Sequence, residues 1–219
     1  MKQRCLEASG GKLKDQDILA IPPFDLRDVT KHDQVVQQVL NHFNRIDILI
    51  NNVGVTQRSN FDAITPEVEK NIMDINLFSQ VNLTKVVCQH FKQMKKGHLG
   101  VTISVCGKFS CPFSASYNAS KYALIGYYDC IRNELPFVDV TLVCPGPIFT
   151  QNISKAHMAG DFEKGKRSYD PEDKRMKVER AAFLYCVALA NRLDEVWISL
   201  KPILFLFYGI QYFPSTFRR

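Results

Sequence analysis

The sequence predicts an α/β protein built on a doubly wound parallel sheet. Short apolar runs alternate with longer segments of helical periodicity, a pattern typical of parallel strands joined by helical crossovers. The runs are almost continuously apolar, as expected when helices cover both faces of a sheet. The length of 219 residues suits one domain with a substantial core, so we expect a single domain over residues 1–219.

The strands are bounded by turn-forming residues. Pro22 and Pro23 end the first apolar run, and Pro145-Gly146-Pro147 ends the fourth. The strands that we expect, in chain order, cover residues 17–21, 46–50, 101–105, 138–144 and 196–199.

The helices carry start and stop signals. Thr65 supplies a cap, Pro66 the first helical position and Glu67 an acid near the positive end of the helix dipole. That helix is long, and we expect a bend near Asn76. Asn44 stands where a glycine commonly ends a helix, and asparagine also tolerates the left-handed conformation. The expected helices cover about residues 28–43, 65–96, 116–135 and 178–191.

The composition gives no indication of a disordered, collagen-like or coiled-coil protein. The chain is 46% hydrophobic and 23% charged, as ordinary globular proteins are. The net charge of +6 could serve an anionic partner, but basic and acidic residues are interleaved and no nucleic-acid-binding motif occurs, so we expect no nucleic acid partner. The seven cysteines form no Cys-x-x-Cys pair and no zinc spacing, so we expect reduced thiols and no metal site.

Two segments near the carboxyl end are candidates for contact with a substrate or a membrane. Residues 150–176 are polar, charged and weakly patterned, which suits a mobile substrate flap. Residues 203–210 are strongly apolar but far shorter than the roughly 20 residues that span a bilayer. They could form a packed terminal helix, cover the substrate pocket or dip into a membrane interface. The polar amino terminus has no signal-peptide core.

Tyr117 and Lys121 are the residues best suited to chemistry. Their spacing of four places the phenol and the ammonium on one helical face. A free phenol has a pKa of about 10 and exchanges protons poorly at neutral pH. A neighbouring cation favours phenolate, so we expect Lys121 to lower the pKa of Tyr117 and make it a general acid or base.

Three strand ends bring further groups to the same rim. Ser104 lies at the end of the strand before Tyr117, thirteen residues upstream. Residues 51–54 and 145–150 follow two other strands directly. Ligands of open α/β sheets bind beyond the carboxyl ends of the strands, so these turns are candidate binding segments.

These residues resemble the short-chain dehydrogenase/reductase family over essentially the whole chain. The matching features are the Tyr-x-x-x-Lys pair at Tyr117 and Lys121, its upstream serine at Ser104, the tetrad asparagine at Asn76, the Asn-Asn-x-Gly turn at 51–54, the Pro-Gly-x-Ile-x-Thr turn at 145–150 and the Asp-plus-apolar pair Asp25-Leu26. The resemblance implies a Rossmann-like fold.

The resemblance also implies roles. Tyr117 would exchange a proton with the substrate oxygen, Ser104 would position that oxygen, and Lys121 would hold the nicotinamide ribose. Asn76 would hold a water that links Lys121 to solvent. The implied cofactor-binding residues are Asp25 and Leu26 on the adenine side, Asn51 and Gly54 along the ribose, Tyr117 and Lys121, and Pro147, Ile148 and Thr150 at the carboxamide end.

One branch of the family is most similar, in the segments at 45–52, 145–147 and 195–199. Its members are membrane-associated, endoplasmic-reticulum reductases of steroid, retinoid and other carbonyl compounds that use NADP(H). The resemblance therefore implies a small hydrophobic carbonyl or alcohol substrate and NADP(H), with NAD open. It also implies residence at that membrane, or in the cytoplasm if the chain has no anchor. Relatives often pair through the two long helices, so a homodimer is open.

The glycine-rich phosphate turn of the family is missing from the sequence. No Gly-x-x-x-Gly-x-Gly or Gly-x-Gly-x-x-Gly occurs, and Gly10-Gly11 follows no strand. By this match the chain lacks the first two strands of the fold, the turn between them and the first helix. We therefore expect weak cofactor binding and an exposed apolar edge on the 46–50 strand. The alternative to a carbonyl reductase is a non-catalytic, truncated isoform that acts through protein association.

Overall fold

A parallel sheet forms the centre of the molecule, as the sequence predicts, but in the part of the chain that the structure describes it has four strands rather than the five expected. The structure is a computed structural model that describes residues 2–149, 157–158 and 175–217. The strand order is β1-β3-β4-β8, and every neighbouring pair is parallel. The strands are β1 (Ile48–Asn51), β3 (Gly97–Thr102), β4 (Val138–Pro145) and β8 (Glu195–Ile198).

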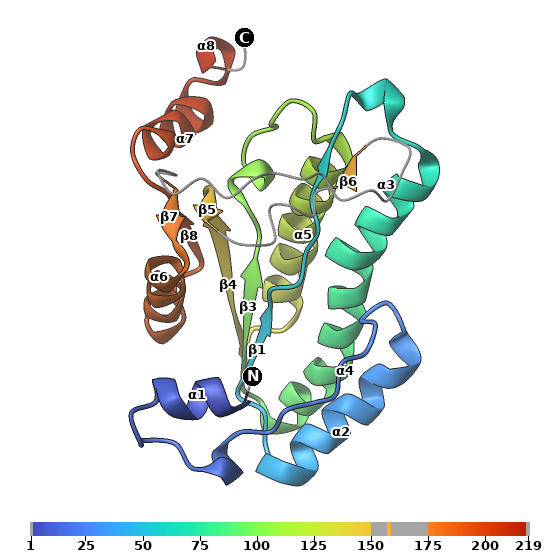
Figure 1. Ribbon diagram of the computed structural model, residues 1–219, viewed down its shortest axis with the longest axis vertical. Helices are drawn as coiled ribbons and strands as arrows, with labels where there is room; N and C mark the ends of the chain where they lie inside the picture. The colour runs from blue at the N-terminus through green and yellow to red at the C-terminus, as the bar shows by residue number, and fades with distance from the viewer. Residues whose placement is uncertain (1, 150–156, 159–174, 218–219) are drawn as a thin grey trace.

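Helices cover the two faces of this sheet. Figure 1 shows α3, α4 and α5 on one side and α6 on the other, with α7 and α8 beyond the upper end of the sheet. The helices are α1 (Lys2–Ala8), α2 (His32–Phe43), α3 (Pro66–Met73), α4 (Ser79–Met94), α5 (Ala115–Glu134), α6 (Val178–Ala190), α7 (Ile203–Tyr212) and α8 (Pro214–Phe217). Two short parallel ladders complete the described part: β2 (Gln57–Arg58) with β6 (His157–Met158), and β5 (Ile148–Phe149) with β7 (Met176–Lys177).

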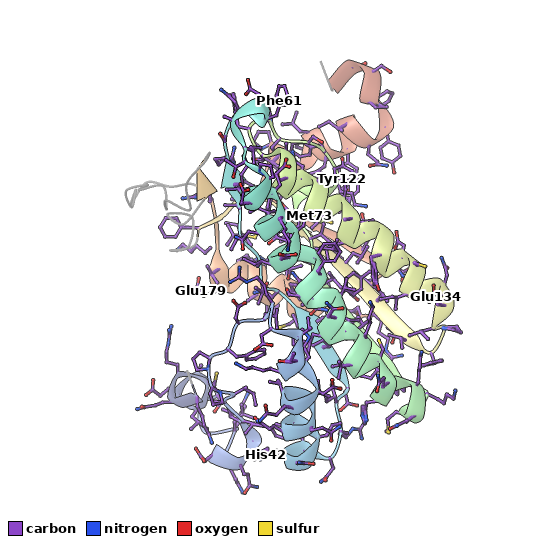
Figure 2. All side chains as sticks on the ribbon, turned by 90° about the vertical axis from the view of Figure 1, so that its right-hand side faces the viewer. His42, Phe61, Met73, Tyr122, Glu134 and Glu179 are labelled. Atoms are coloured by element: carbon purple, nitrogen blue, oxygen red, sulfur yellow. The ribbon has the colours of Figure 1, made fainter. Side chains whose placement is uncertain are left out.

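The main core lies between the sheet and the α4–α5 layer. Full burial of a large apolar side chain stabilises a fold by about 1.5–3 kcal/mol, so this layer fixes α5 against the sheet. Figure 2 shows α5, which carries Tyr122, beside the helix that continues from Met73. The most deeply buried members of the cluster are Phe91, Leu99, Val101, Leu124, Tyr128, Leu142 and Cys144.

The long helix bends where the sequence predicts. Thr65 caps α3 by accepting a hydrogen bond from the backbone N–H of Val68 at 3.4 Å. Between α3 and α4 the chain forms a π-helical turn, η4 (Asp74–Phe78), and Asn76 lies buried within it. Such turns recur at functional sites. Asn44 ends α2 in the left-handed conformation with φ 62°, as expected.

Two strand predictions differ from the structure. Residues 17–21 form no strand: a 3₁₀ turn, η1 (Asp15–Asp17), is followed by irregular chain. A strand needs a hydrogen-bonding neighbour, and this segment pairs with none of the described strands. The strand predicted at 101–105 runs instead over Gly97–Thr102. Gly97 lies close to the Phe91 ring and Gly100 close to α6.

β1 forms one edge of the sheet in the described part of the chain. Ile48 and Ile50 point to the same face and are 46% and 49% exposed. This confirms the exposed apolar strand that the sequence predicts.

The apolar segment near the carboxyl end forms the packed helix α7. Its Phe207 is buried against the ring of Trp197, with centroids 5.5 Å apart. Several of its other large side chains are exposed, among them Phe205, Tyr208 and Tyr212. Across the described ranges, the structure contains no helix with the length and apolarity to cross a bilayer.

Candidate active site

Ser104 lies just beyond the carboxyl end of β3, in the turn that leads to α5. It caps a short 3₁₀ turn, η5 (Val105–Gly107), and its hydroxyl accepts a hydrogen bond from the backbone N–H of Cys106 at 3.1 Å. This backbone contact fixes the buried hydroxyl of Ser104 relative to the sheet.

Tyr117 lies in the first turn of α5 and faces the turn that holds Ser104. Burial raises the pKa of Tyr117 to about 12. A hydrogen bond with Ser104 and the charge of Arg58 on β2 act in the opposite direction and lower that pKa. The phenol therefore keeps its proton at neutral pH and is set up as a donor.

Lys121 lies one turn further along α5 and is fully enclosed. Its ammonium donates a hydrogen bond to the backbone carbonyl of Thr102 at 2.9 Å. Its Nζ lies 5.8 Å from the centroid of the Tyr117 ring. Burial lowers the pKa of Lys121 to about 8, because the charged form loses its hydration.

The direction of the Tyr117 pKa differs from our expectation. We expected Lys121 to lower it, yet burial dominates and raises it. The ammonium of Lys121 is directed to the Thr102 carbonyl, and the cation that favours the phenolate is Arg58. Tyr117 and Lys121 share a helical face, as predicted. Their spacing along the helix does not determine which group the Lys121 ammonium contacts.

Asn76 joins three segments around the same place. Its side-chain oxygen accepts from the backbone N–H of Val55 at 2.8 Å, and its nitrogen donates to the Val55 carbonyl at 2.9 Å. The second N–H donates to the hydroxyl of Ser120 on α5 at 3.0 Å. Both N–H groups are thus used for structure, and one lone pair of the oxygen remains.

Gly54 lies between the side chains of Asn76 and Lys121. A Cβ at this position would lie 3.4 Å from Oδ1 of Asn76 and 3.5 Å from Nζ of Lys121. The glycine keeps this space narrow but open. An ammonium has three donors, and in the described residues Lys121 uses one, on Thr102. Two donors remain for hydroxyl groups such as those of a ribose, so these residues fit the nicotinamide half of a dinucleotide.

Other residues expected around a cofactor have structural partners. Asn51 is buried and donates to the hydroxyls of Thr84 and Tyr128, both at 2.8 Å, which ties β1 to α4 and α5. Asp25 is exposed, and hydrogen bonds from Arg27 lower its pKa to about 2. The carbonyl oxygen of Leu26 lies at hydrogen-bond distance, 2.8 Å, from Nε2 of His32. None of the hydrogen bonds among described residues links these three to Ser104 or Tyr117, so their cofactor role stays a prediction.

The turn after β4 is described in part. The Pro147 carbonyl accepts from the backbone N–H of Met176 at 3.3 Å, and Ile148 pairs with Met176 in the β5–β7 ladder. Thr150 and most of the predicted flap at 150–176 lie outside the described residues.

The sequence reasoning missed three contributors to the site. Arg58 lies far from Tyr117 along the chain, so only the fold could reveal its charge effect. The Thr102 carbonyl is backbone and leaves no sequence signal. Ser120 stands between Tyr117 and Lys121, and its position next to the pair was the one available hint.

One side of the site is apolar. Phe109, Tyr117 and Trp197 pack against one buried cluster, which consists of Val105, Cys106 and Phe207. The ring centroids of Phe109 and Phe207 are 5.2 Å apart. Where side chains are described, no cluster of three His, Cys, Asp or Glu residues could hold a metal ion.

Comparisons with known proteins show which family and fold the chain resembles. A family model described as short chain dehydrogenase matches residues 3–159. The curated relative "Dehydrogenase/reductase SDR family member 7" of Homo sapiens is 38% identical over 218 residues, which are 98% of this chain and 63% of the relative. The chain thus spans less than two thirds of that relative, which belongs to the branch expected from the sequence.

Solved structures share the fold. A short chain dehydrogenase/reductase from Burkholderia phymatum, in complex with NAD, superposes with a TM-score of 0.79 at 18% identity, covering 99% of this chain and 80% of that one. A short chain dehydrogenase from Burkholderia cenocepacia, in complex with NADP, gives a TM-score of 0.72 at 22% identity, covering 90% of this chain and 77% of that one.

Proposed function

This chain belongs to the short-chain dehydrogenase family, and we propose that it interconverts a hydrophobic carbonyl compound and its alcohol with NADP(H). The observation that carries the proposal is the convergence of Ser104, Tyr117 and Lys121. A hydroxyl, a protonated phenol and a buried ammonium are the groups that a carbonyl needs when it takes up hydride and a proton.

Each side chain has a distinct part in the proposed reaction. Tyr117 donates its proton to the carbonyl oxygen, which its pKa of about 12 permits at neutral pH. Ser104 hydrogen-bonds the same oxygen and stabilises the charge that develops on it. Lys121 offers its two remaining donors to ribose hydroxyls. When bound between these residues, a nicotinamide would supply the hydride that the carbonyl carbon takes up. Asn76 holds the Gly54–Val55 segment in place beside Lys121.

The apolar surroundings support a hydrophobic substrate. Tyr117 belongs to the same hydrophobic cluster as Phe109, Trp197 and Phe207, so the neighbourhood of the phenol is rich in aromatic side chains. A steroid- or retinoid-like compound is the substrate class that we propose, on the likeness to the member 7 relative. The choice of NADP(H) over NAD rests on the same likeness. Location at the endoplasmic-reticulum membrane and pairing through α4 and α5 stay predictions.

The proposed activity requires cofactor binding, and we expect the affinity of this chain for the cofactor to be low. The sequence carries no glycine-rich phosphate turn, and a dinucleotide draws much of its affinity from such a turn. We therefore propose weak NADPH binding by this chain. A saturable NADPH titration at micromolar concentration would contradict this part.

A second candidate function is protein association without catalysis. The exposed side chains of Ile48 and Ile50 on the edge strand favour it, because an apolar edge stabilises contacts with another chain. The two candidates differ in one measurable respect: only the first needs the Tyr117 hydroxyl.

The decisive experiment measures NADPH oxidation with a panel of hydrophobic ketones at millimolar cofactor. Tyr117→Phe removes only the proton donor, so we expect turnover to fall by about 10²–10⁴-fold. Tyr122→Phe is the matched control: it lies on the same helix, is 41% exposed, and should keep full turnover. Turnover that is equal in both variants overturns the proposal. A complete lack of turnover in the wild-type chain favours the association function.

A further inference from the structure

Two cysteines lie in direct contact beside the active site. The thiol of Cys106 donates a hydrogen bond to the sulfur of Cys111, with the two Sγ atoms 3.2 Å apart. All seven cysteines of the chain are free thiols. The remaining five cysteines lack such a sulfur contact in the described structure.

Local structure holds the two cysteines in this arrangement. Cys106 belongs to the η5 turn, and its backbone N–H is bound to Ser104 at 3.1 Å. The Cys111 carbonyl accepts from the side-chain nitrogen of Asn118 on α5 at 2.9 Å. Each cysteine is thus tied by a hydrogen bond to a defined element, the η5 turn or α5, and these bonds hold the two sulfurs next to each other.

The two thiols differ in acidity and exposure. The hydrogen bond from Cys106 lowers the pKa of Cys111, and Arg58 acts in the same direction, whereas the same bond and burial raise the pKa of Cys106. Cys111 also lines an open depression of about 560 Å³ together with Phe113, Asn118 and Tyr122. The more acidic thiol is therefore the one that a small solute reaches, while Cys106 is buried behind it.

We propose that Cys106 and Cys111 form a redox-active dithiol, which a small hydroperoxide converts to an intramolecular disulfide and a thiol reductant restores. A thiolate that is accessible and next to a second thiol has the arrangement typical of redox-sensing cysteines. A metal site is a poorer explanation, because the described residues place no third ligand of the His, Cys, Asp or Glu type beside the pair.

The reaction balances in two steps. The Cys111 thiolate attacks one oxygen of hydrogen peroxide, the O–O bond breaks, and the leaving hydroxide takes up a proton to become water. Sγ of Cys106 then attacks the Cys111 sulfenic acid. The S–S bond forms, the S–O bond breaks, and the departing hydroxide leaves with the Cys106 proton as a second water. Two thiols thus lose two electrons to one peroxide.

The sequence makes this bond easy to detect. Trypsin cleaves after Lys96, Lys108 and Lys121, so the two cysteines fall in separate peptides, 97–108 and 109–121, each with a single cysteine. The reduced full chain is treated with one to a few equivalents of hydrogen peroxide, blocked with N-ethylmaleimide and digested. We expect the two peptides as one cross-linked species, two hydrogens lighter than their sum, which dithiothreitol separates.

Variants assign the order of events. In Cys106→Ser, we expect oxidation to stop at a sulfenic acid on Cys111, which dimedone traps. In Cys111→Ser, Cys106 should stay reduced at the same peroxide concentration, because it is buried. Cys130→Ser is the matched control on an exposed cysteine and should leave the cross-link unchanged. Circular dichroism checks that each variant is folded.

A second measurement does not depend on peroxide. Phenylarsine oxide bridges two neighbouring thiols, so it should protect Cys111 from alkylation in the wild-type chain and leave Cys111 open to alkylation in Cys106→Ser. The proposal is overturned if peroxide oxidises Cys5, Cys130 or Cys186 while both peptides carry maleimide. It is equally overturned if the disulfides found are between chains. None of these readouts requires turnover, so they are independent of the proposed enzyme activity.

Discussion

The ammonium of Lys121 donates a hydrogen bond to the carbonyl of Thr102 at 2.9 Å, which joins α5 to the last residue of β3. The bond holds a charged group in a site that excludes water, and burial lowers the pKa of Lys121 from 10.5 to about 8. Burial of that charge costs stability, and the cost depends on pH.

The first prediction concerns this pH dependence. Between pH 8 and 10.5 the unfolded chain keeps the Lys121 proton while the folded chain releases it, so the free energy of unfolding rises with pH in this window. Below pH 8 both states are protonated and the full cost is present. Lys121→Met removes the cost, so the amount by which its free energy of unfolding exceeds that of the wild type should shrink by up to about 3 kcal/mol as the pH rises through the window.

Urea unfolding at several pH values measures this difference between Lys121→Met and the wild type. Lys85→Met, on the exposed face of α4, is the control, and the same pH trend in both variants would contradict the prediction.

The second prediction concerns Asn76. Its side chain makes three hydrogen bonds, two to Val55 and one to Ser120. Asn76→Ala leaves the backbone N–H and carbonyl of Val55 without these partners, while the Ser120 hydroxyl keeps its bond to the Tyr117 carbonyl. We therefore expect a loss of roughly 2–4 kcal/mol in the free energy of unfolding. Asn76→Asp should recover only part of it, because a carboxylate cannot donate to the Val55 carbonyl. Asn60→Ala, at an exposed position without a side-chain cap bond, should change stability by less than about 0.5 kcal/mol. Equal losses at both positions would show that the Asn76 network adds nothing.

The third prediction uses two glycines with opposite surroundings. At Gly97 a Cβ would lie 2.2 Å from Cγ of the Phe91 ring, and no small shift relieves such a contact in the core. Gly97→Ala should destabilise the fold by about 1–3 kcal/mol. At Gly126, inside α5, nothing lies within 4 Å of the added carbon. Gly126→Ala should stabilise the fold by about 0.5–1 kcal/mol. Thermal unfolding separates the two, and shifts of the same sign would refute the argument.

The fourth prediction concerns the edge strand β1. Ile48 and Ile50 present apolar surface on a strand that has one neighbour in the described structure. The double variant Ile48→Lys, Ile50→Lys should aggregate less on heating, because charges on an edge oppose strand pairing. Light scattering measures this. Phe61→Lys, at a side chain that is 80% exposed in the turn η3 (Phe61–Ala63), is the matched control and should have a smaller effect. A similar reduction by the control would attribute aggregation to general surface hydrophobicity.

Much of the fold could be predicted because its signals are local. Thr65 and Asn44 mark the ends of helices through their own side chains and backbone, and both act as expected. The bend at Asn76 was also predicted, although not its π-helical form. By contrast, residues 17–21 have the composition of a strand but form none, since a strand exists only where a neighbour accepts its hydrogen bonds.

In the candidate active site, too, some features could be predicted from the sequence and others depend on the tertiary structure. The identity of Tyr117, Lys121 and Ser104 followed from spacing and from resemblance to a family, and the fold brings the three together. The direction of the Tyr117 pKa, by contrast, was not predictable, because it depends on burial and on Arg58, which lies 59 positions away along the chain. The contact between Cys106 and Cys111 also escaped the sequence, which showed no Cys-x-x-Cys pair.

The sequence by itself determined the α/β alternation, the order of the elements and the residues able to move a proton, because each is encoded in neighbouring positions along the chain. Only the tertiary structure decided which of these groups is desolvated, which carbonyl takes the Lys121 ammonium and which thiols touch. Those outcomes depend on solvent exclusion and on distances between segments far apart in the chain, and no local pattern specifies either.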